Sequence, residues 1–392
     1  MSLSRNPDRQ AAVVGIGQTE FSKASGRSEL QLAAECIRSA MADAGIAPAE
    51  IDGMVTFSLD NNDEIGLGRC LGIENLNFSS RVPNGGLGSV GTLAHAAAVI
   101  ESGLCEVVVI WRAMNERSQY RFGQPMVNQA IAPGGGTGFM EWCAPFGAQT
   151  PASWIALGAQ RYMSTYGVDN EDFGRIAVSQ RQYAATNPAA WFHGKPMRLA
   201  DHQQSRWVAP PVLRLLDCCQ ESDGGVALVL TRLSRARHLR QPPVRVLAAT
   251  QSMPFDTEVA TNFYHGDLAR MVEGEATARR LYALTGLGPQ HMQAAMLYDA
   301  FTPLVMMQLE AFGFCGPGEG RDFVRDGHLG PGGRLPVNTH GGLLSEAYIH
   351  GVNSMAEGVR QVRGSAANPV PGVEHVLLSS CFAGAILGRD QN

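Results

Sequence analysis

The sequence predicts an α/β protein in which one βαβαβ-type unit is used twice. Three observations lead to this fold class. Short apolar strands alternate with amphipathic helices, the same order of elements occurs in both halves, and a Gly-Gly pair precedes a small-residue helix in each half. The 392 residues are too many for one ordinary core and suit two domains of ordinary size.

The first half opens with an apolar strand at residues 11–16. A helix is expected over 28–44, because Ser28 is a suitable N-cap, apolar residues repeat at helical spacing and Gly45 can end the helix. The chain then resumes as a strand over residues 51–57.

The second half repeats this order. A strand is expected at residues 243–251, and residues 273–301 predict a helix, a glycine stop, a short helix and a further strand. The parallel includes the Gly-Gly pairs, because residues 82–111 and 337–380 each predict a turn, a buried helix and a buried strand. A duplicated α/β fold with buried parallel strands accounts for both correspondences.

The boundary between the halves is expected near residue 241, which gives an N-terminal half of 1–241 and a C-terminal half of 242–392. An insertion at about 113–216 interrupts the first half. It contains an irregular, partly apolar loop followed by two helices, predicted at 151–167 and 170–188. An insertion of this kind is a natural wall for a substrate site.

Composition excludes several function classes. A net charge of −5 and a pI near 6.1 give no basic surface for nucleic acid, and no apolar run is long enough for a membrane span. The absence of an apolar signal segment at the N-terminus predicts a cytoplasmic protein, and eight cysteines without a CxxC pair suit a reducing compartment without structural zinc. Only 17% of residues are charged, so we expect an oligomer or a stable heterocomplex.

Two conspicuous motifs favour structural roles. The Gly-Ile-Gly run at 15–17 lacks the third glycine and the acidic residue of a dinucleotide-binding fingerprint. The cysteine pair at 218–219 could suggest redox chemistry, but adjacent side chains point to opposite sides of an extended chain, which favours packing. Asp217 and Asp223 beside it are expected to hold turn amides.

The segment AAMLYDAFTP, residues 294–303, is a candidate for chemistry. Its apolar strand delivers Tyr298 and Asp299 to the strand's carboxyl end, which is where sites form in open α/β sheets. The ordinary role of such a tyrosine is packing with a satisfied hydroxyl. The functional interpretation gains weight because the duplicated topology brings a second polar turn to a strand end.

That second turn is NTHGGLLSEAYIHG, residues 338–351, which carries four groups able to hold or move a proton: His340, Glu346, Tyr348 and His350. Asn338 and the amides of the Gly-Gly pair at 341–342 could form an oxyanion site for a carbonyl that gains negative charge. His340 suits a turn former and a catalyst equally, and Tyr348 is expected on the following helix.

These motifs together resemble the thiolase superfamily, and specifically its sterol-carrier-protein type of thiolase-like chains. The resemblance covers nearly the whole chain and rests on LLDCCQESDGG at 215–225, on the helix at 151–167 and on the NTHGG turn. It implies a five-layered αβαβα fold, dimerisation edge to edge and an acyl-CoA ligand.

The departures from the thiolase pattern are informative. The nucleophilic cysteine of a thiolase falls on Gly85 or Gly86, and its GHP motif falls on residues 347–349, with Tyr348 in place of histidine. The second thiolase histidine falls on Tyr298. Cys381 is near the position of the C-terminal acid-base cysteine, although its surroundings match that motif only loosely. Because a glycine cannot form an acyl-enzyme, covalent transfer is excluded at that position.

Tyrosines in place of both histidines resemble the thiolase-like steroid side-chain aldolases called lipid-transfer proteins, whose YD-x-F and SEAY patterns match residues 298–301 and 345–348. This implies retro-aldol cleavage of a β-hydroxyacyl-CoA on a sterol or bile-acid side chain, giving a ketone or aldehyde plus propionyl-CoA or acetyl-CoA. It also implies a partner with an OB-fold domain of the kind found beside acyl-CoA hydratases, in a heterotetramer. Coenzyme A would be part of the substrate, and no other cofactor is expected.

We expect Tyr298 and Tyr348 to act as the acid-base pair, and the thioester to serve as the electron sink. His340 is expected to donate to the enolate or to tune a tyrosine, Asp299 to orient its neighbourhood, and Glu346 to be an alternative base. His350 is assigned a structural role. Two weaker candidates lie on a polar stretch: Tyr264 and His265.

Two other functions remain open on the sequence. The chain could be a non-catalytic thiolase-like scaffold subunit of an acyl-CoA hydratase complex. It could also be a ligase or an acetyl-CoA acetyltransferase-type thiolase that uses Cys381. The aldolase is preferred over the scaffold because decay of an unused site would more often leave small or apolar residues than two tyrosines.

Overall fold

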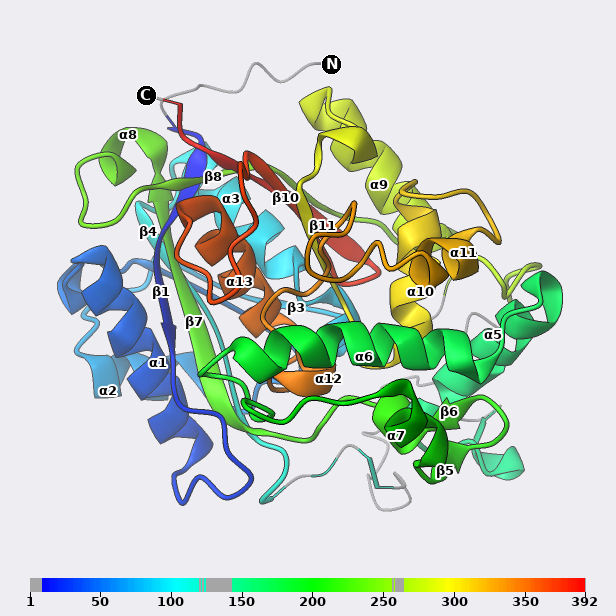
Figure 1. The fold of residues 1–392 in the computed structure, drawn as a ribbon. Coiled ribbons are helices and arrows are strands. Elements are labelled where there is room, and N and C mark those ends of the chain that lie inside the picture. Colours follow the sequence, from blue (N-terminus) through cyan, green and yellow to red (C-terminus); the bar gives the residue numbers. More distant parts are fainter. Residues whose placement is uncertain are drawn as a thin grey trace.

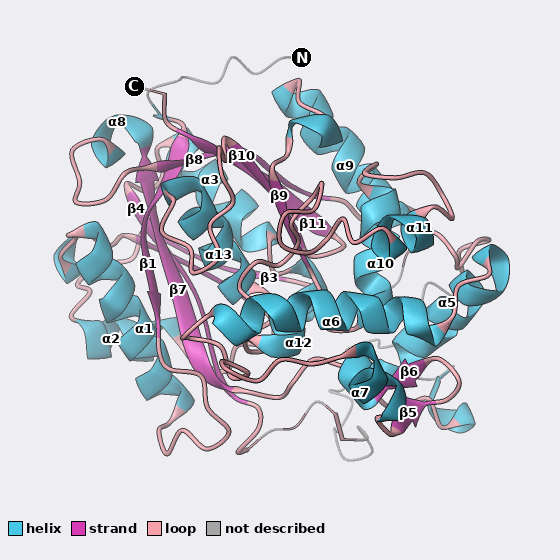
Figure 2. Ribbon diagram, viewed as in Figure 1, coloured by secondary structure: helices cyan, strands magenta, loops and turns pink. Residues whose placement is uncertain are grey.

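A computed structural model of the chain describes residues 9–119, 121, 123–124, 143–255, 257 and 264–391. Within these residues the main sheet has nine strands in the order β3-β2-β4-β7-β1-β8-β11-β10-β9, and a separate pair is formed by β5 and β6 (Figures 1 and 2). The strand bounds are β1 Ala11–Gln18, β2 Gly53–Phe57, β3 Phe78–Val82, β4 Val107–Asn115, β5 Trp207–Ala209, β6 Leu213–Arg214, β7 Asp223–Arg232, β8 Val244–Gln251, β9 Ala294–Leu297, β10 His375–Ser379 and β11 Ala383–Arg389.

Helices cover the outer faces of the sheet, and two of them lie between its two halves. Their bounds are α1 Glu29–Ala44, α2 Glu64–Leu71, α3 Gly91–Ser102, α5 Pro151–Tyr166, α6 Asn170–Thr186, α7 Leu199–Gln204, α8 Leu233–Ala236, α9 Val272–Thr285, α10 Thr302–Ala311, α11 Gly320–Arg325, α12 Gly342–Ser345 and α13 Val352–Arg363. Short 3-10 helices link them, and the one that matters for the site spans Gly85–Gly88.

The strand order confirms the predicted duplication. In the first half β2 pairs in parallel with β3 and β4, and β7 pairs antiparallel with β4 and β1. The second half repeats this arrangement, because β9 pairs in parallel with β10, and β11 pairs antiparallel with β10 and β8. A parallel bridge from Ala295 to Val337 stands where the first half has β3. The two Gly-Gly turns therefore follow equivalent strands.

The layers are those expected of a five-layered αβαβα fold. The helices α3 and α13 contact strands of both halves and lie between them, α1 packs on β1, β4 and β7, and α9 packs on β8 and β11 (Figure 1). The strands β1 and β8 pair over only two residue positions, so the halves join along a short seam.

The predicted helix boundaries and the structural role of the Gly-Ile-Gly run are borne out. The side chain of Ser28 accepts a hydrogen bond from the Gln31 amide, and Gly45 ends α1 in a left-handed conformation. Gly15 and Gly17 lie inside β1, and a Cβ at either would overlap the backbone of α1 at Ala40. These glycines therefore allow close helix–strand packing and form no dinucleotide-binding turn.

The two helices predicted in the insertion are α5 and α6. The insertion also contains α7 and the β5–β6 pair, which were not predicted, and all of these elements lie between β4 and β7. Most of its irregular loop, residues 125–142, lies outside the described residues. The division into halves at residue 241 stays a prediction. None of the described helices is long and apolar enough to cross a membrane.

Candidate active site

The end of β9 is held in place by Asn338. Its side-chain oxygen accepts a hydrogen bond from the Leu297 amide at 2.8 Å, and its nitrogen donates to the Leu297 carbonyl at 2.9 Å. Asn338 is fully buried and has a positive φ of 53°. The expectation that Asn338 donates to a substrate oxyanion is therefore wrong, because its amide already pairs with the backbone of β9.

Asp299 occupies the anion site that the Gly-Gly turn forms. Its carboxylate accepts hydrogen bonds from the amides of Leu343 at 2.9 Å and Leu344 at 3.2 Å, in the first turn of α12. A Cβ at Gly342 would overlap this carboxylate, so the close approach requires glycine. Burial raises the pKa of Asp299 to about 7, against the effect of these amides. The geometry supports the orienting role expected of Asp299.

Tyr298 and Tyr348 meet in the interior, with their hydroxyl oxygens 2.9 Å apart. They are 3% and 8% exposed, and burial raises the pKa of both well above the ordinary value of a tyrosine. Tyr348 lies in the loop between α12 and α13, so the expectation of a helical position is wrong. The sequence resemblance and the structure thus bring the same two residues together.

Gly86 faces this tyrosine pair. A Cβ at Gly86 would overlap the hydroxyl oxygen of Tyr298, whereas one at Gly85 would meet only the side chain of Leu59. Of the two candidates for the thiolase nucleophile position, Gly86 is therefore the one that faces the site. The Tyr298 hydroxyl fills the space that a cysteine side chain would need.

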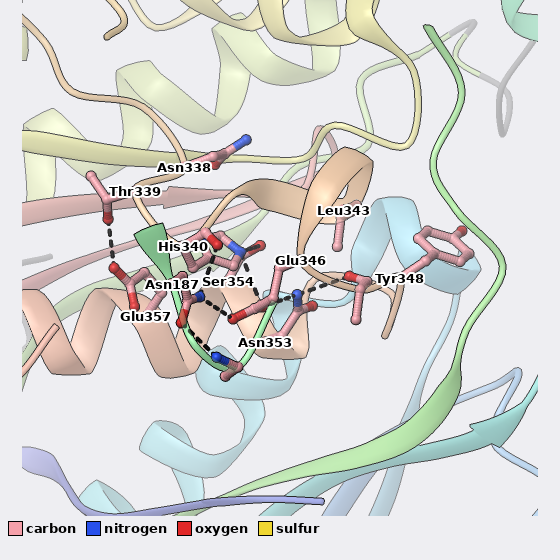
Figure 3. Close-up of polar contacts among 12 residues, drawn as sticks. Asn187, Asn338, Thr339, His340, Leu343, Glu346, Tyr348, Asn353, Ser354 and Glu357 are labelled. Atoms are coloured by element: carbon pink, nitrogen blue, oxygen red, sulfur yellow. Dashed lines mark hydrogen bonds and ion pairs between the residues drawn. The ribbon is translucent and has the colours of Figure 1, made fainter. Parts of the chain in front are cut away.

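His340 and Glu346 belong to a separate buried cluster. Glu346 accepts hydrogen bonds from the side-chain amides of Asn187 at 3.1 Å and Asn353 at 2.8 Å, and His340 Nε2 lies 3.8 Å from its carboxylate. His340 Nε2 also lies 3.3 Å from the hydroxyl of Ser354. Figure 3 shows these residues gathered around Glu346, while the ring of Tyr348 extends away from them.

Burial leaves both His340 and Glu346 largely uncharged at neutral pH. Burial and the charge of Arg360 lower the pKa of His340 to about 3, so the imidazole is neutral, and burial raises the pKa of Glu346 to about 8. Among the described residues, the hydrogen bonds of both side chains stay within the cluster. Among the described residues, neither His340 nor Glu346 has a direct hydrogen bond to the hydroxyl of Tyr298 or Tyr348, and the roles expected of them stay predictions.

His350 contacts Tyr348 of the tyrosine pair. Its ring packs edge-on against Tyr348, with the ring centroids 4.7 Å apart, and its Nδ1 accepts a hydrogen bond from Arg112 Nε at 3.1 Å. Arg112 in turn pairs with Asp60 at 3.1 Å. The sequence showed one sign of this network, because an arginine directly follows the apolar run of β4.

Glu116 is a second residue that the motifs did not reveal. It follows β4, is 3% exposed, and its Oε2 has no hydrogen-bond partner among the described residues. Burial raises its pKa well above the ordinary value, and its charge contributes to the raised pKa of Tyr298 and Tyr348. The Ser222 amide binds this carboxylate, and the Ser222 hydroxyl accepts from the Tyr348 amide at 3.2 Å.

The cysteines near the site are not activated. Burial raises the pKa of Cys219 and of Cys381 well above the ordinary value of a thiol.

Asp217 and Asp223 accept hydrogen bonds from backbone amides, as predicted, the first from the Arg214 amide at 2.7 Å and the second from the Arg117 amide. Of the two weaker candidates, Tyr264 is 57% exposed, and the half-buried His265 contacts the backbone at Asp267.

An apolar cavity of about 50 Å³ borders the Gly86 turn. Leu87, next to Gly86, lines it together with Phe382, whose amide donates to the Leu87 carbonyl at 3.1 Å. The remaining lining comes mainly from α5, α10 and the segment just before α9. Among the described residues, no cluster of three or more potential metal ligands was found.

Comparisons with known proteins agree with this fold. A family model described as Thiolase C-terminal domain-like matches residues 260–386. A steroid side-chain-cleaving aldolase of Thermomonospora curvata is 50% identical over 97% of this chain and 98% of its own length. The 17-hydroxy-3-oxo-4-pregnene-20-carboxyl-CoA lyase of Mycobacterium tuberculosis is 50% identical over 95% of this chain and 96% of its own.

Solved structures give the same result. An Ltp2-ChsH2(DUF35) aldolase matches with a TM-score of 0.93 and 49% identity, over 99% of this chain and 100% of that chain. Human mitochondrial 3-ketoacyl-CoA thiolase matches at 0.68 with 12% identity, over 98% of this chain and 100% of its own, which shows the fold alone. The chain therefore belongs to the thiolase-like family that includes the steroid side-chain-cleaving aldolase and the 17-hydroxy-3-oxo-4-pregnene-20-carboxyl-CoA lyase.

Proposed function

We propose that the chain is a carbon–carbon lyase that cleaves a steroid β-hydroxyacyl-CoA by a retro-aldol reaction. The observation that carries this proposal is the contact between the hydroxyls of Tyr298 and Tyr348. It lies beside Gly86, which stands where a thiolase has its nucleophilic cysteine. Two relatives at 50% identity are named as an aldolase and a CoA lyase. Covalent acyl transfer is disfavoured, because a thiol at residue 86 would overlap the Tyr298 hydroxyl.

The reaction requires one proton to change place. The hydroxyl on the β carbon loses its proton, the Cα–Cβ bond breaks, and its electron pair passes into the thioester enolate. The enolate then takes a proton at the α carbon, so the proton balance is zero. The hydroxyl carbon becomes a carbonyl and the other fragment leaves as a shorter acyl-CoA. No redox partner or cofactor is needed, because the thioester itself is the electron sink.

The tyrosine pair suits this balance. Because burial raises both tyrosine pKa values, neither phenolate is populated to a useful extent at neutral pH. A relay avoids the phenolate: one tyrosine accepts the substrate proton while it passes its own to the second tyrosine, which protonates the α carbon. The 2.9 Å separation of the hydroxyl oxygens is a hydrogen-bond distance and permits this transfer.

The substrate class follows from the relatives. In 17-hydroxy-3-oxo-4-pregnene-20-carboxyl-CoA the hydroxyl carbon bears the side chain whose next carbon carries a methyl group and the thioester. Retro-aldol cleavage of this compound gives a 17-ketone and propionyl-CoA, so we favour propionyl-CoA over acetyl-CoA as the product.

A partner protein is part of the proposal. The solved structure at 49% identity is named as an Ltp2-ChsH2(DUF35) aldolase, which supports a DUF35-type partner with an OB-fold domain. We further propose a homodimer through the exposed edge of the sheet at β3, which would give a heterotetramer with two partner chains. The adjacent free thiols of Cys218 and Cys219 support a reducing, cytoplasmic location.

The decisive experiment is mass spectrometry of products from the 17-hydroxy acyl-CoA, with the chain alone and with its OB-fold partner. We expect the 17-ketone and propionyl-CoA in equal amounts. A non-catalytic scaffold would give no turnover with any partner. A thiolase using Cys381 would be inactivated by a thiol reagent and would trap an acyl-cysteine.

Substitution of the tyrosines tests the relay. Tyr298→Phe and Tyr348→Phe should each lower kcat by about 10²–10⁴-fold. The double variant should be little worse than the poorer single one, because the two residues act as a unit. Tyr282→Phe is the matched control, since its hydroxyl donates to the Phe312 carbonyl away from the site. Near-full activity of both single variants would rule out the relay.

A further inference from the structure

We propose that His350 is a further catalytic residue, which donates a hydrogen bond from its Nε2–H to the thioester oxygen as that oxygen gains enolate charge. This inference deepens the proposed function and rests on it. Three observations carry it: a buried chain of contacts that fixes the tautomer of His350, the position of its ring beside Gly86 and the tyrosine pair, and its backbone conformation.

The chain of contacts begins at Asp60. Its carboxylate accepts hydrogen bonds from Arg112 Nη1 at 3.1 Å and from the Ala113 amide at 3.1 Å, and Trp111 Nε1 approaches at 3.3 Å. Arg112 Nε then donates to His350 Nδ1 at 3.1 Å. Asp60 and Arg112 are 3% and 1% exposed. A buried charge pair with this many hydrogen bonds has little freedom to rearrange, so it holds the imidazole in one orientation.

The partner at Nδ1 determines where the imidazole proton lies. A guanidinium can only donate, so Nδ1 must accept, and the neutral ring carries its hydrogen on Nε2. Burial and the charge of Arg112 lower the pKa of His350 well below its ordinary value, which keeps the ring neutral. Among the described groups that face the ring, Arg112 and Tyr348 are titratable or charged. A neutral imidazole N–H can polarise a carbonyl without transferring its proton.

The ring is placed where an enolate would form. A Cβ at Gly86 would lie 2.9 Å from His350 Cδ2, the ring atom bonded to Nε2, and would overlap the hydroxyl of Tyr298. Cδ2 therefore faces the same position as the Tyr298 hydroxyl. Nε2, the next ring atom, lies across the ring from the Nδ1 that Arg112 binds. Phe57 packs edge-on against His350 with the ring centroids 5.4 Å apart, which excludes water from one side.

The backbone at His350 is also unusual. His350 has φ of 50° and is followed by Gly351 with φ of 83°, so two successive residues adopt left-handed conformations. Such a conformation costs free energy at a residue with a Cβ, and it persists where the surroundings impose it. Here it turns the ring from the loop after Tyr348 back toward Arg112 and Gly86.

Three variants test the role of the ring. His350→Gln keeps an acceptor for Arg112 and an N–H donor, and should retain kcat within about tenfold. His350→Phe keeps the aromatic packing without either nitrogen, and should lose about 10²–10³-fold in kcat with little change in KM. His202→Gln is the matched control for the loss of a buried histidine, because His202 is fully buried on Asp217 in the insertion. It should lower stability without lowering kcat.

A measurement without turnover separates this inference from the proposed function. In protein labelled with ¹⁵N-histidine, the wild-type chain with its partner should show an Nε2–H, Nδ1-acceptor ring that does not titrate between pH 5.5 and 9. Adding the 17-deoxy acyl-CoA, which cannot be cleaved, should shift the Nε2 and its proton downfield. This shift without turnover of the 17-hydroxy compound would overturn only the proposed function. Turnover with no shift, or with full activity of His350→Phe, would overturn the role of His350.

Discussion

At the scale of single residues, the absence of one side chain decides the chemistry. Gly86 leaves the space that the Tyr298 hydroxyl occupies. Where a thiolase has a nucleophilic cysteine, this site therefore has a hydroxyl that can transfer a proton. Because no cysteine marks the nucleophile position, the motif comparison could not decide between Gly85 and Gly86. Their order in the chain is visible in the sequence, but only the backbone conformation shows which of them faces the tyrosines.

Gly86→Ala tests this contact. The added methyl should displace the Tyr298 hydroxyl, lower kcat by at least tenfold and destabilise the fold by about 1–3 kcal/mol through overpacking. The double variant Gly86→Ala/Tyr298→Phe should recover stability relative to Gly86→Ala, because the overlapping oxygen is gone, while remaining inactive. Urea unfolding and product assays measure both effects. Additive losses of stability would show that the two residues do not compete for the same space.

The raised pKa of Glu346 predicts that the stability of the fold depends on pH. Its pKa of about 8 in the folded chain exceeds the ordinary value of 4.5, so the folded state binds the proton more tightly than the unfolded state. This contribution to the free energy of unfolding is fully present below pH 4.5 and is lost as the pH rises to 8. Glu346→Gln should therefore flatten the decline of stability between pH 5 and 9, measured by urea unfolding. An unchanged slope would contradict a protonated Glu346.

At the scale of elements, the short helix α12 positions Tyr348 through its bond to Asp299. Asp299→Asn should keep one accepted amide and place an NH₂ group against the other, at a cost of about 1–3 kcal/mol. We expect lower thermal stability together with a lower kcat, because Tyr348 follows α12 after two residues. A calorimetric scan and a product assay check this. Lost stability with unchanged kcat would show that α12 does not position the tyrosine.

Elements whose signals are local were predictable, and those set by distant contacts were not. Ser28, Gly45 and the helical spacing between them gave α1 from the sequence. Tyr348 was expected on a helix, yet α12 ends at Ser345, where backbone groups are taken by remote partners. Trp191 donates its amide to the Glu346 carbonyl, and so does the side chain of Gln220. No local sequence pattern predicts these remote partners.

The same limit explains the site. Tyr298 and Tyr348 could be found from the sequence because motif positions locate them. His340 was favoured over His350 because it stands beside the Gly-Gly turn, but the fold turns His340 toward Glu346 and brings His350 to Arg112, which lies in the other half. Pairings between the halves depend on the packing of α3 and α13, which sequence periodicity does not specify.

At the scale of the whole molecule, duplication creates the site. Gly86 comes from the first half, whereas both tyrosines come from the second, and each half supplies one Gly-Gly turn after an equivalent strand. In the first half the turn leaves the space that the Tyr298 hydroxyl occupies. In the second half the turn binds the carboxylate of Asp299. The Gly-Gly turn thus makes room for a tyrosine hydroxyl in one half and binds a carboxylate in the other. Gly86 and the tyrosine pair come together at the contact between the halves.

This arrangement predicts cooperative unfolding despite the two halves. The helices α3 and α13 each contact strands of both halves, so neither half can lose its partner without exposing the helix layer between them. Calorimetry should show one transition whose van't Hoff and calorimetric enthalpies agree. Separately produced fragments 1–241 and 242–392 should each fail to give a cooperative transition. Two resolved transitions, or an independently folded fragment, would instead establish the boundary near residue 241 as one between autonomous domains.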